Sequence, residues 1–503
     1  MEPVPVKIPP GFFRNGTEYE SAGRWYDGNL VRWDNNGRMR PVGGWRRVIA
    51  GGGTLTGKAR AILGWRANNG FRFVAIGTNE KLYIGSGGRY ADLSPVGLVP
   101  GRPDAIEGPG YGAGPYGREG YGTRRSNDTL VLDAATWSLD TWGENLVGVL
   151  SSDGRIFQWA PTGGVLPAPI TNAPTNCTGV LVTDEGHLIA LGPGTNRRKA
   201  QWCSQGDNTL WTPADTNSAG SRNLKTNGNI MTGRIVGGQP VIWTTVDAHV
   251  LDYLGYPRVY GNRKVGDACG LVSPAAVVTD ENSAIWMGQG SFFRYDGTVQ
   301  PLPCEVGSYV FGDFNRLQQS KVFATQTAQF TESTWFYCSA GSIEIDRYVT
   351  LNRGLKPWRW YFGQLARTCW LDAGMLQYPL AVDPNGVIWE HEVGFLADGA
   401  SRNADVFAQS GPAEIQNGGR ILYANLMLPD VEGRASIQLR VNTKTAPDGA
   451  SASFGPYSFV PNREGYVPVR FAGRQAALRI EQIADADWGL GTQRFLTAPG
   501  GRR

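Results

Sequence analysis

The chain has 503 residues, of which 69 are Gly, 31 are Pro and 11% are aromatic, while only 18% are charged. This length is too great for one simple core, so we expect two domains or one large closed architecture with an appendage. The formal net charge of +4 does not give the strongly basic footprint expected of a protein that grips nucleic acid. No long stretch has helical periodicity, and the composition is that of an all-β, turn-rich chain.

The cysteines and the N-terminus bear on where the chain is made. Six cysteines are scattered through the sequence without a CxxC pair, which favours buried thiols in a reduced compartment over a disulfide framework. Residues 1–13 lack the basic and apolar regions of a signal peptide, and no run of about 18 apolar residues occurs. We therefore expect a soluble chain that is synthesised in a cytoplasm.

Residues 1–50 are predicted to form an arm that needs another part of the chain to lie against. Met1–Arg24 is punctuated by Pro and Gly and is expected to be extended. Two segments with apolar residues follow, Trp25–Trp33 and Arg38–Val48, and the turn Asn35-Asn36-Gly37 separates them.

Gly270–Phe311 is the clearest run of short strands in the sequence. Turn residues occur at Glu281-Asn282 and at Asp296-Gly297, and the segments between the turns alternate in side-chain character as strands do. We predict a meander of short antiparallel strands that includes Ser283–Met287 and Ser291–Tyr295.

Looser copies of this hairpin pattern recur along the chain at intervals of roughly forty to sixty residues. Seven are predicted, at Arg60–Ile84, Leu146–Trp159, Gly179–Leu191, Pro240–Leu254, Gly270–Phe311, Thr334–Asp346 (pairing Thr334–Cys338 with Ser342–Asp346) and Tyr378–His391. The spacing is typical of propeller blades, in which radial repetition protects the sheet edges. We predict a β-propeller of about six or seven blades, with a pair of β-sandwiches as the alternative.

The pattern changes after His391, where longer strands are predicted. They span Glu414–Leu428, Ala435–Val441, Ser451–Val460 and Tyr466–Ile483. We expect a C-terminal β-sandwich-like domain that the N-terminal arm completes, because a propeller brings the two ends of its repeat region together. The predicted domains are the arm (1–50), which packs on the C-terminal domain, closes the propeller or does both, the propeller (51–395) and the C-terminal β-rich domain (396–503).

Gly108–Gly122 stands apart from the repeats and reads GPGYGAGPYGREGYG. Such a run cannot bury a core, so we expect a mobile loop. Tyr and Arg in and after this segment are candidate contacts with a partner chain or with nucleic acid in a channel. The candidates are Tyr111, Tyr116, Tyr121, Arg124 and Arg125. The alternative interpretation is a solvated insertion between two blades.

A search for catalytic residues gives little. The histidines His187, His249 and His391 lie far apart and form no metal-binding pattern. In Glu390-His391-Glu392, neighbouring strand residues point to opposite faces, so the three side chains are not expected to converge. Motifs for phosphate loops, dinucleotide binding and nucleophile elbows are missing from the sequence. We predict that the chain is not an enzyme and has no metal site, no cofactor and no small-molecule substrate.

A series of short motifs runs through the middle and end of the chain. In order, it comprises Gln201–Ser204 with Gly206-Asp207 and Leu210-Trp211, GLVSP at 270–274, FFRYDG at 292–297, PLPCEV at 301–306, Asp346–Tyr348, Leu365–Thr368, Trp389–Gly394 and Asp398-Gly399. The series resembles the tail hub or nozzle proteins of short-tailed bacteriophages, also described as packaged-DNA stabilisation proteins. The resemblance covers roughly residues 20–400, and its motifs are structural turns rather than chemistry.

The resemblance implies a structural virion protein of a phage tail, synthesised in the host cytoplasm. It implies a homo-oligomer, a hexameric ring below the portal and its adaptor proteins. This nozzle or hub retains packaged DNA, passes double-stranded DNA without sequence specificity and anchors tail fibres or spikes. The near-neutral composition is compatible with this role, because strong phosphate binding would slow the passage of a genome. The resemblance supplies no catalytic residue.

Two other functional classes stay open. A carbohydrate-binding or carbohydrate-cleaving propeller would use some of the 17 Trp residues as flat faces for sugars. Cleavage would need two carboxylates about 5 to 9 Å apart in a Trp-lined pocket. A receptor-binding or fibre-anchoring module would never line a channel, and it would be a trimer or a monomer rather than a closed six-fold ring.

Overall fold

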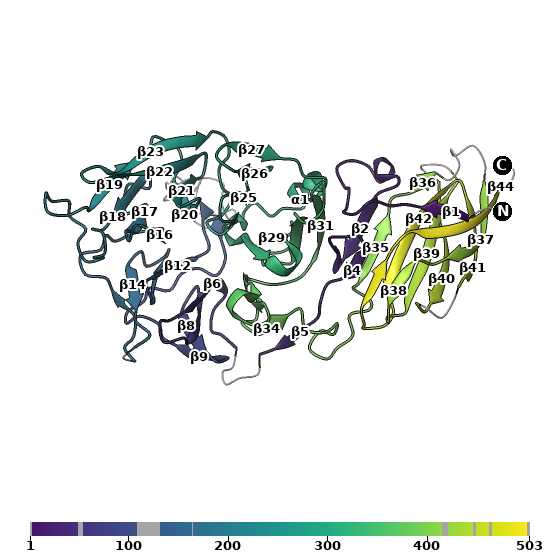
Figure 1. Ribbon diagram of the computed structural model, residues 1–503, viewed down its shortest axis with the longest axis horizontal. Helices are drawn as coiled ribbons and strands as arrows, with labels where there is room; N and C mark the ends of the chain where they lie inside the picture. The colour runs from purple at the N-terminus through teal and green to yellow at the C-terminus, as the bar shows by residue number, and fades with distance from the viewer. Residues whose placement is uncertain are drawn as a thin grey trace, which may run out of the picture.

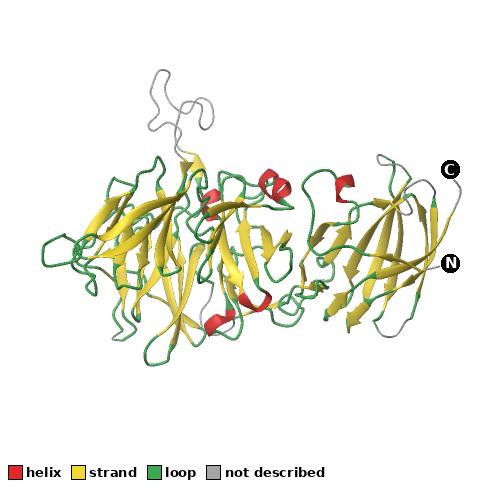
Figure 2. Cartoon of the chain, turned by 45° about the horizontal axis from the view of Figure 1, so that its top comes forward, coloured by secondary structure: helices red, strands yellow, loops and turns green. Residues whose placement is uncertain are grey.

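The chain folds into two β-rich bodies that lie along the long axis of the molecule (Figure 1). Both termini lie in the smaller body, at the end away from the larger one (Figure 1). Strands form almost all of the regular structure and the few helices are short (Figure 2). The computed structural model describes residues 3–48, 54–107, 131–162, 164–414, 421–445, 449–461 and 465–499. None of the helices in these ranges has the length and apolarity that a membrane crossing requires.

The larger body is a β-propeller, and seven four-stranded antiparallel sheets form its blades within the described ranges. Blade 1 is β6 (Ala59–Arg66), β7 (Arg72–Thr78), β8 (Leu82–Ser86) and β9 (Arg89–Asp92); blade 2 is β12 (Trp137–Trp142), β13 (Asn145–Leu150), β14 (Ile156–Trp159) and β15 (Ala168–Pro169); blade 3 is β16 (Gly179–Val182), β17 (Leu188–Leu191), β18 (Lys199–Trp202) and β19 (Gly220–Asn223).

The remaining blades follow the same strand order. Blade 4 is β20 (Ile230–Val236), β21 (Gln239–Thr244), β22 (Ala248–Gly255) and β23 (Val259–Gly266); blade 5 is β24 (Val277–Thr279), β25 (Ala284–Met287), β26 (Phe292–Tyr295) and β27 (Val299–Leu302); blade 6 is β28 (Phe323–Thr327), β29 (Glu332–Tyr337), β30 (Arg347–Asn352) and β31 (Arg359–Gln364); blade 7 is β32 (Cys369–Leu371), β33 (Leu380–Val382), β34 (Ile388–His391) and β5 (Trp45–Arg47). The first strand of each blade contacts that of the next, and β32 contacts β6, so the ring is closed.

Blade 7 is built from two distant parts of the chain. Strand β5 precedes blade 1 in the sequence, yet it pairs antiparallel with β34 and forms the fourth strand of blade 7. The N-terminal arm therefore joins the first and last blades, which covers the strand edge that an open propeller would expose.

The smaller body is a sandwich-like domain to which both chain ends contribute. One sheet holds β1 (Pro3–Val6), β44 (Gln493–Pro499), β37 (Leu422–Leu428) and β41 (Val467–Gly473); a second holds β2 (Trp25–Asn29), β35 (Phe407–Ser410), β42 (Gln475–Gln482), β39 (Ile437–Lys444) and β40 (Ala452–Phe459), with β36 (Ala413–Glu414) on β42; a third holds β3 (Val31–Trp33), β4 (Met39–Pro41), β43 (Trp488–Leu490) and β38 (Val431–Gly433). The predicted fold, an all-β propeller with a C-terminal sandwich-like domain completed by the N-terminal arm, is confirmed.

Burial patterns distinguish the two bodies. The second strands of blades, such as β17 and β25, are buried at every position, since neighbouring blades cover both of their faces. Strand β39 of the sandwich alternates buried and half-buried residues, as a strand with one face on a core does.

Turn glycines appear where the sequence predicts them; Gly186 and Gly386 have φ angles of +83° and +79°.

Three predicted strands are wrong. Glu414–Leu428 is not one strand, because Glu414 ends β36 on the second sheet of the sandwich, whereas β37 begins at Leu422 in the first sheet. Ser342–Asp346 is not a strand, because the side chain of Asp346 accepts hydrogen bonds from the backbone and hydroxyl of Ser339 and closes a loop there; the strand begins at Arg347. Tyr466–Ile483 is not one strand but two, β41 and β42, since the chain turns at Arg474 and passes from one sheet of the sandwich to the other.

One hydrophobic core runs through both bodies. Buried residues of the sandwich, such as Ile437 and Phe471, belong to the same packed cluster as Trp286 of blade 5 and Trp335 of blade 6. Phe12 of the arm bridges them; its ring lies 4.9 Å from that of Phe362 in blade 6. The propeller and the sandwich therefore share packing rather than meeting only through a linker.

Candidate functional site

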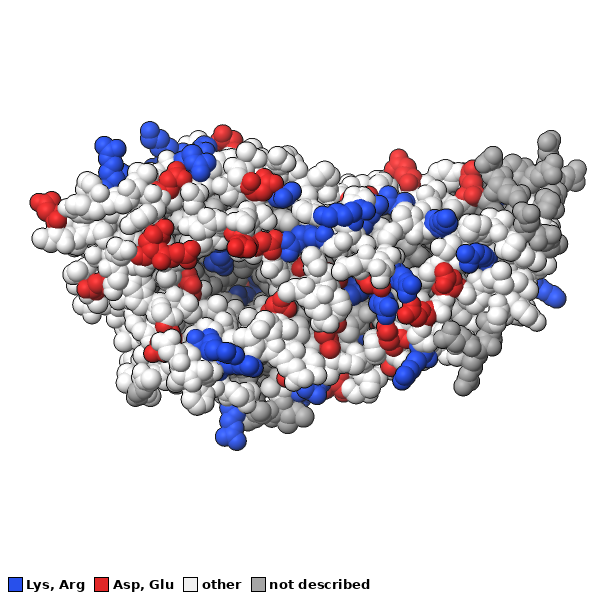
Figure 3. Space-filling model, viewed as in Figure 1, with Lys and Arg blue, Asp and Glu red and all other residues white. Residues whose placement is uncertain are grey.

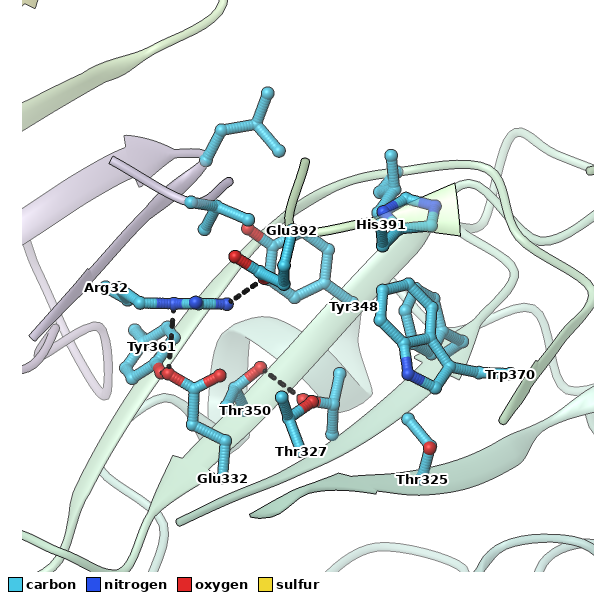
Figure 4. A pocket seen from close by; sticks show the side chains of 15 residues that line it. Arg32, Thr325, Thr327, Glu332, Tyr348, Thr350, Tyr361, Trp370, His391 and Glu392 are labelled. Carbon is cyan, nitrogen blue, oxygen red and sulfur yellow. Dashed lines mark hydrogen bonds and ion pairs between the residues drawn. The ribbon is translucent and has the colours of Figure 1, made fainter. Parts of the chain in front are cut away.

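Charged side chains meet in a pocket where the N-terminal arm contacts blades 6 and 7 (Figure 4). Strand β3 places Arg32 there, β29 supplies Glu332, and Glu392 follows directly after β34. We call this the junction pocket. It is lined by Leu30, Arg32, Val42, Thr325, Thr327, Glu332, Thr334, Phe336, Tyr348, Thr350, Tyr361, Leu365, Trp370, His391 and Glu392.

Arg32 is the centre of the junction pocket. Its Nε lies 3.2 Å from Glu332 Oε1, and its Nη2 donates a 2.7 Å hydrogen bond to Glu392 Oε1. The guanidinium carbon also lies 3.7 Å from the centre of the Phe330 ring. The side chain of Arg32 is 8% exposed, so burial works against its charge, but the two carboxylates raise its pKa above the ordinary value.

Glu332 is the more deeply buried carboxylate of the pair, with 4% of its side chain exposed. Burial raises the pKa of Glu332 to about 6, although Arg32 acts in the opposite direction. The hydroxyl of Tyr361 donates a hydrogen bond to this carboxylate, and burial together with Glu332 raises the pKa of Tyr361. Tyr361 is therefore a neutral donor to a carboxylate whose pKa is raised by burial.

His391 lies on the other side of the pocket and is held as a neutral ring. Its Nε2 accepts a 2.8 Å hydrogen bond from Nε of Arg367, which can only donate. The ring lies between those of Trp45 and Trp370, at 5.6 and 4.4 Å between centroids. Burial and then the nearby arginines hold the pKa of His391 well below its ordinary value. With Nε2 occupied, His391 is a packing and accepting group.

The side chains of Glu390, His391 and Glu392 were expected not to converge. The structure agrees for Glu390, but not for His391 and Glu392. Glu390 points away and pairs with Arg46, with 2.7 Å between Oε2 and Nε. Glu392 and His391, however, both line the junction pocket. The strand ends at His391 and Glu392 has a φ of +59°, so the alternation of faces stops there.

The junction pocket is too small for an organic substrate. Its cavity measures about 40 Å³, room for about three water molecules. The two carboxylates and Trp370 that a sugar-cleaving site would need are present, but the guanidinium of Arg32 binds both carboxylates. This arrangement is a buried ion cluster that joins the arm to the propeller.

The propeller encloses a second cavity on its axis. It measures about 340 Å³ and is lined by first strands of blades, including β6, β12, β20 and β28. Asp140 and Arg234 face it; burial raises the pKa of Asp140 and lowers that of Arg234. Among the described residues Asp140 is the one carboxylate lining this axial cavity, so it does not offer the pair that glycoside cleavage requires.

The candidate contact residues from the sequence lie outside the described residues. These are Tyr111, Tyr116, Tyr121, Arg124 and Arg125. The strands that flank the segment are described: β10 (Ile106–Glu107) pairs antiparallel with β11 (Val131–Leu132), so its two ends are adjacent.

The cysteines are free thiols, most of them buried. All six cysteines are free and all but Cys304 are fully buried, and burial raises the pKa of each thiol, for example to about 12 for Cys177. Across the described part of the chain, no group of three or more His, Cys, Asp or Glu side chains is placed to hold a metal ion.

Of the residues that line the junction pocket, sequence reasoning considered only His391 and Glu392, which it did not expect to converge, and it missed Arg32 and Glu332. Arg32 and Glu392 are 360 positions apart. The one local signal is the charge itself: Arg32 stands between Val31 and Trp33, and Glu332 begins the strand ESTWFY. A charge inside an apolar strand points to a buried partner, but not to its identity.

Comparison with known proteins adds no family. No protein-family model matches the sequence, and no curated protein matches it significantly. Among solved structures, virginiamycin B lyase from Staphylococcus aureus is 8% identical, with 66% of this chain and 94% of that chain covered and a TM-score of 0.41. A streptogramin B lyase structure is 8% identical over 69% of this chain and 96% of that one, with a TM-score of 0.40. The AfRom2 CNH domain is 12% identical over 56% and 90%, with a TM-score of 0.33. Similarity at this level assigns neither a family nor an activity to this chain.

Proposed function

We propose that the chain is a structural subunit of a bacteriophage tail. In this proposal copies of it form a ring-shaped nozzle or hub, hexameric and below the portal and its adaptor proteins. The ring extends the DNA channel, retains packaged DNA and anchors fibres or spikes. The chain acts in the virion, without a catalytic role.

The observation that carries the proposal is the fusion of propeller and sandwich into one body. The arm runs through both, as β1 to β4 of the sandwich and as β5 of blade 7. The buried Arg32–Glu332–Glu392 cluster and the continuous core fix the angle between the two bodies. A subunit that must hold several partners at set positions in a ring benefits from such a rigid joint, because subunit geometry decides whether a ring closes.

Arg402 strengthens the joint at a second place. Its buried guanidinium donates to the backbone carbonyls of Val42, Gly43 and Phe395 at 2.5, 3.1 and 2.8 Å. These carbonyls belong to the segments that enter and leave the propeller. One side chain thus binds both of the chain segments that connect the two bodies.

Motifs of the series that carries the resemblance form strands, turns and links between blades of the propeller. GLVSP links blades 4 and 5, where the backbone N–H of Leu271 donates a 3.0 Å hydrogen bond to the carbonyl of Thr244. FFRYDG covers β26 and the turn after it, with Phe292 and Tyr295 buried. Motifs that fix turns and blade contacts favour a shared architecture over a shared active site.

Light scattering on purified chain, alone and with the adaptor proteins of its virion, tests the assembly part of the proposal. We expect a soluble monomer alone and a closed ring on the adaptor. A stable hexamer of the lone protein would overturn templated assembly while leaving the ring in place. A trimer, or a monomer that never forms a ring, would favour the receptor-binding or fibre-anchoring alternative.

A further inference from the structure

The axial cavity of the propeller has the size of a ligand site. Its volume of about 340 Å³ lies within the range of about 300 to 1,000 Å³ that small-molecule pockets occupy. Figure 3 shows a hollow at the centre of the propeller, with cationic side chains inside it. Three charged residues line the cavity: Arg60, Asp140 and Arg234. Ligand sites commonly combine such a small number of charged groups with apolar walls.

Asp140 is held by the backbone and keeps its charge uncompensated. Its Oδ1 accepts a hydrogen bond from Thr141 N and its Oδ2 one from Val182 N, both at 2.8 Å. Each oxygen of a carboxylate has a second lone pair, so both can accept a further bond. Among the described residues no cationic side chain forms an ion pair with Asp140. The carboxylate therefore has room for a cationic partner.

Arg234 has donors that no described residue uses. Its Nη1 donates to the carbonyl of Gly233 at 3.1 Å, and this is its one hydrogen bond within the described part of the chain. A guanidinium has five N–H donors in a planar fork that matches a carboxylate. Since no described carboxylate forms an ion pair with Arg234, most of this fork is available to a ligand.

The blades hold the two charged groups apart. Asp140 belongs to β12 of blade 2 and Arg234 to β20 of blade 4, while β16 of blade 3 lies between these strands and contacts both. Burial raises the pKa of Asp140 and lowers that of Arg234, and each group acts on the other against the effect of burial. Two opposite charges thus face one cavity without touching. Because uncompensated charges inside a protein are costly, a ligand that contacts both is favoured.

The other polar groups of the lining are already satisfied or neutral. Arg60 binds both carboxylate oxygens of Glu344 at 2.8 Å, so its charge is compensated. The thiol of Cys369 is neutral, because burial raises its pKa to about 12. Arg234 and Asp140 therefore decide which charges the cavity accepts. A simple anion would be repelled by Asp140 and a simple cation by Arg234, whereas a molecule with both charges suits the pair.

The walls around the two charges are largely apolar and aromatic. They include Ile62, Leu63, Trp137, Val277, Phe323 and Trp370. Such walls favour a ligand that also carries an apolar or aromatic body.

We propose that the axial cavity binds a small zwitterion of the amino-acid class. Arg234 binds its carboxylate, Asp140 binds its ammonium group, and its apolar side chain lies against the aromatic walls. The ligand connects blades 2 and 4 across the axis of the propeller. This site goes beyond the proposed function and does not rest on it, because it uses no surface through which subunits or tail partners would meet.

Isothermal titration calorimetry of the full chain with L-phenylalanine and two analogues tests the proposal. Phenethylamine lacks the carboxylate and 3-phenylpropionate lacks the ammonium group. We expect L-phenylalanine to bind with a Kd below about 1 mM. Each analogue should bind about 30-fold more weakly or not at all, since it leaves one buried charge without its partner.

Two variants connect the loss of affinity to the two residues. Arg234→Gln should weaken L-phenylalanine binding about 30-fold or more and remove the preference over phenethylamine. Asp140→Asn should do the same for the preference over 3-phenylpropionate. Arg66→Gln and Asp184→Asn change exposed residues of the same types and are the matched controls, which should bind as the wild type does.

Three results would overturn the proposal. They are no binding of L-phenylalanine at about 10 mM, equal affinity of the wild type for all three compounds, and equal losses in the site variants and the controls. 3-Phenylpropionate binding as tightly as L-phenylalanine would show an anion site instead and would also overturn it. If a site variant does not fold, the three compounds on the wild type still decide. Ring formation is measured separately by scattering, so either proposal can fail alone.

Discussion

Arg32 donates a 2.7 Å hydrogen bond to Glu392 across 360 positions of the sequence. This contact ties the third strand of the arm to the end of the last propeller strand. Because Arg32 also contacts Glu332 in blade 6, one guanidinium connects the arm with two blades. Three charged groups that lie together away from water thus join the two bodies, in addition to the shared core and Arg402.

Replacing Arg32 by Met should destabilise the chain strongly. The change leaves Glu332 and Glu392 buried without a cation, which costs about 3 to 5 kcal/mol when one partner of a buried pair is removed. The free energy of unfolding in urea measures the loss. Arg46→Met, which breaks the exposed pair with Glu390, is the matched control and should change stability little. Equal effects of the two changes would show that the junction charges do not hold the bodies together.

Glu332 should make stability depend on pH. Its pKa is about 6 in the folded chain, above the ordinary 4.5. Between these values the folded chain holds a proton that the unfolded chain releases, so this group's contribution to stability falls as pH rises from 4.5 to 6. The fall is on the order of 2 kcal/mol.

The variant Glu332→Gln should remove this pH dependence. Urea unfolding of both proteins at a series of pH values gives the comparison, and the wild type should lose stability relative to the variant as pH rises. Parallel curves would mean that Glu332 titrates normally and that the pocket is wetter than the structure shows.

Trp45 should be needed for closure of the propeller. Its ring packs on His391 and lies 5.3 and 5.1 Å from the guanidinium carbons of Arg367 and Arg402. Trp45→Ala should lower the free energy of unfolding by about 3 kcal/mol and expose the edge of β34 to aggregation. Size-exclusion chromatography and urea unfolding check both effects. Arg47→Ala, on the same strand but exposed, should leave both nearly unchanged.

The blades could be predicted from the sequence, since their signals are local. Turns such as Asp184-Glu185-Gly186 and Pro384-Asn385-Gly386 mark the reversals, and the strands beside them are rich in apolar residues. The pairing of β5 with β34 carries no such signal, because no turn joins them. Arg32 and Glu332 were missed for the same reason, and Glu392 was considered without its partner Arg32. A contact between distant segments leaves only an unexplained buried charge in each of them.

Deleting Gly108–Gly122 should leave the fold intact. Ile106 pairs with Leu132 and Glu107 with Val131, so the chain ends at this segment already lie side by side and a shorter connection can span them. We expect wild-type expression and melting temperature, with impaired assembly or DNA retention in the particle. Loss of soluble protein would show that the segment is structural.

A cryo-electron microscopy class average of the native particle tests the central claim most directly. We predict a closed six-fold ring of this chain on the tail axis. Absence of the chain from the particle, or its presence as an off-axis trimer or monomer, would contradict this prediction.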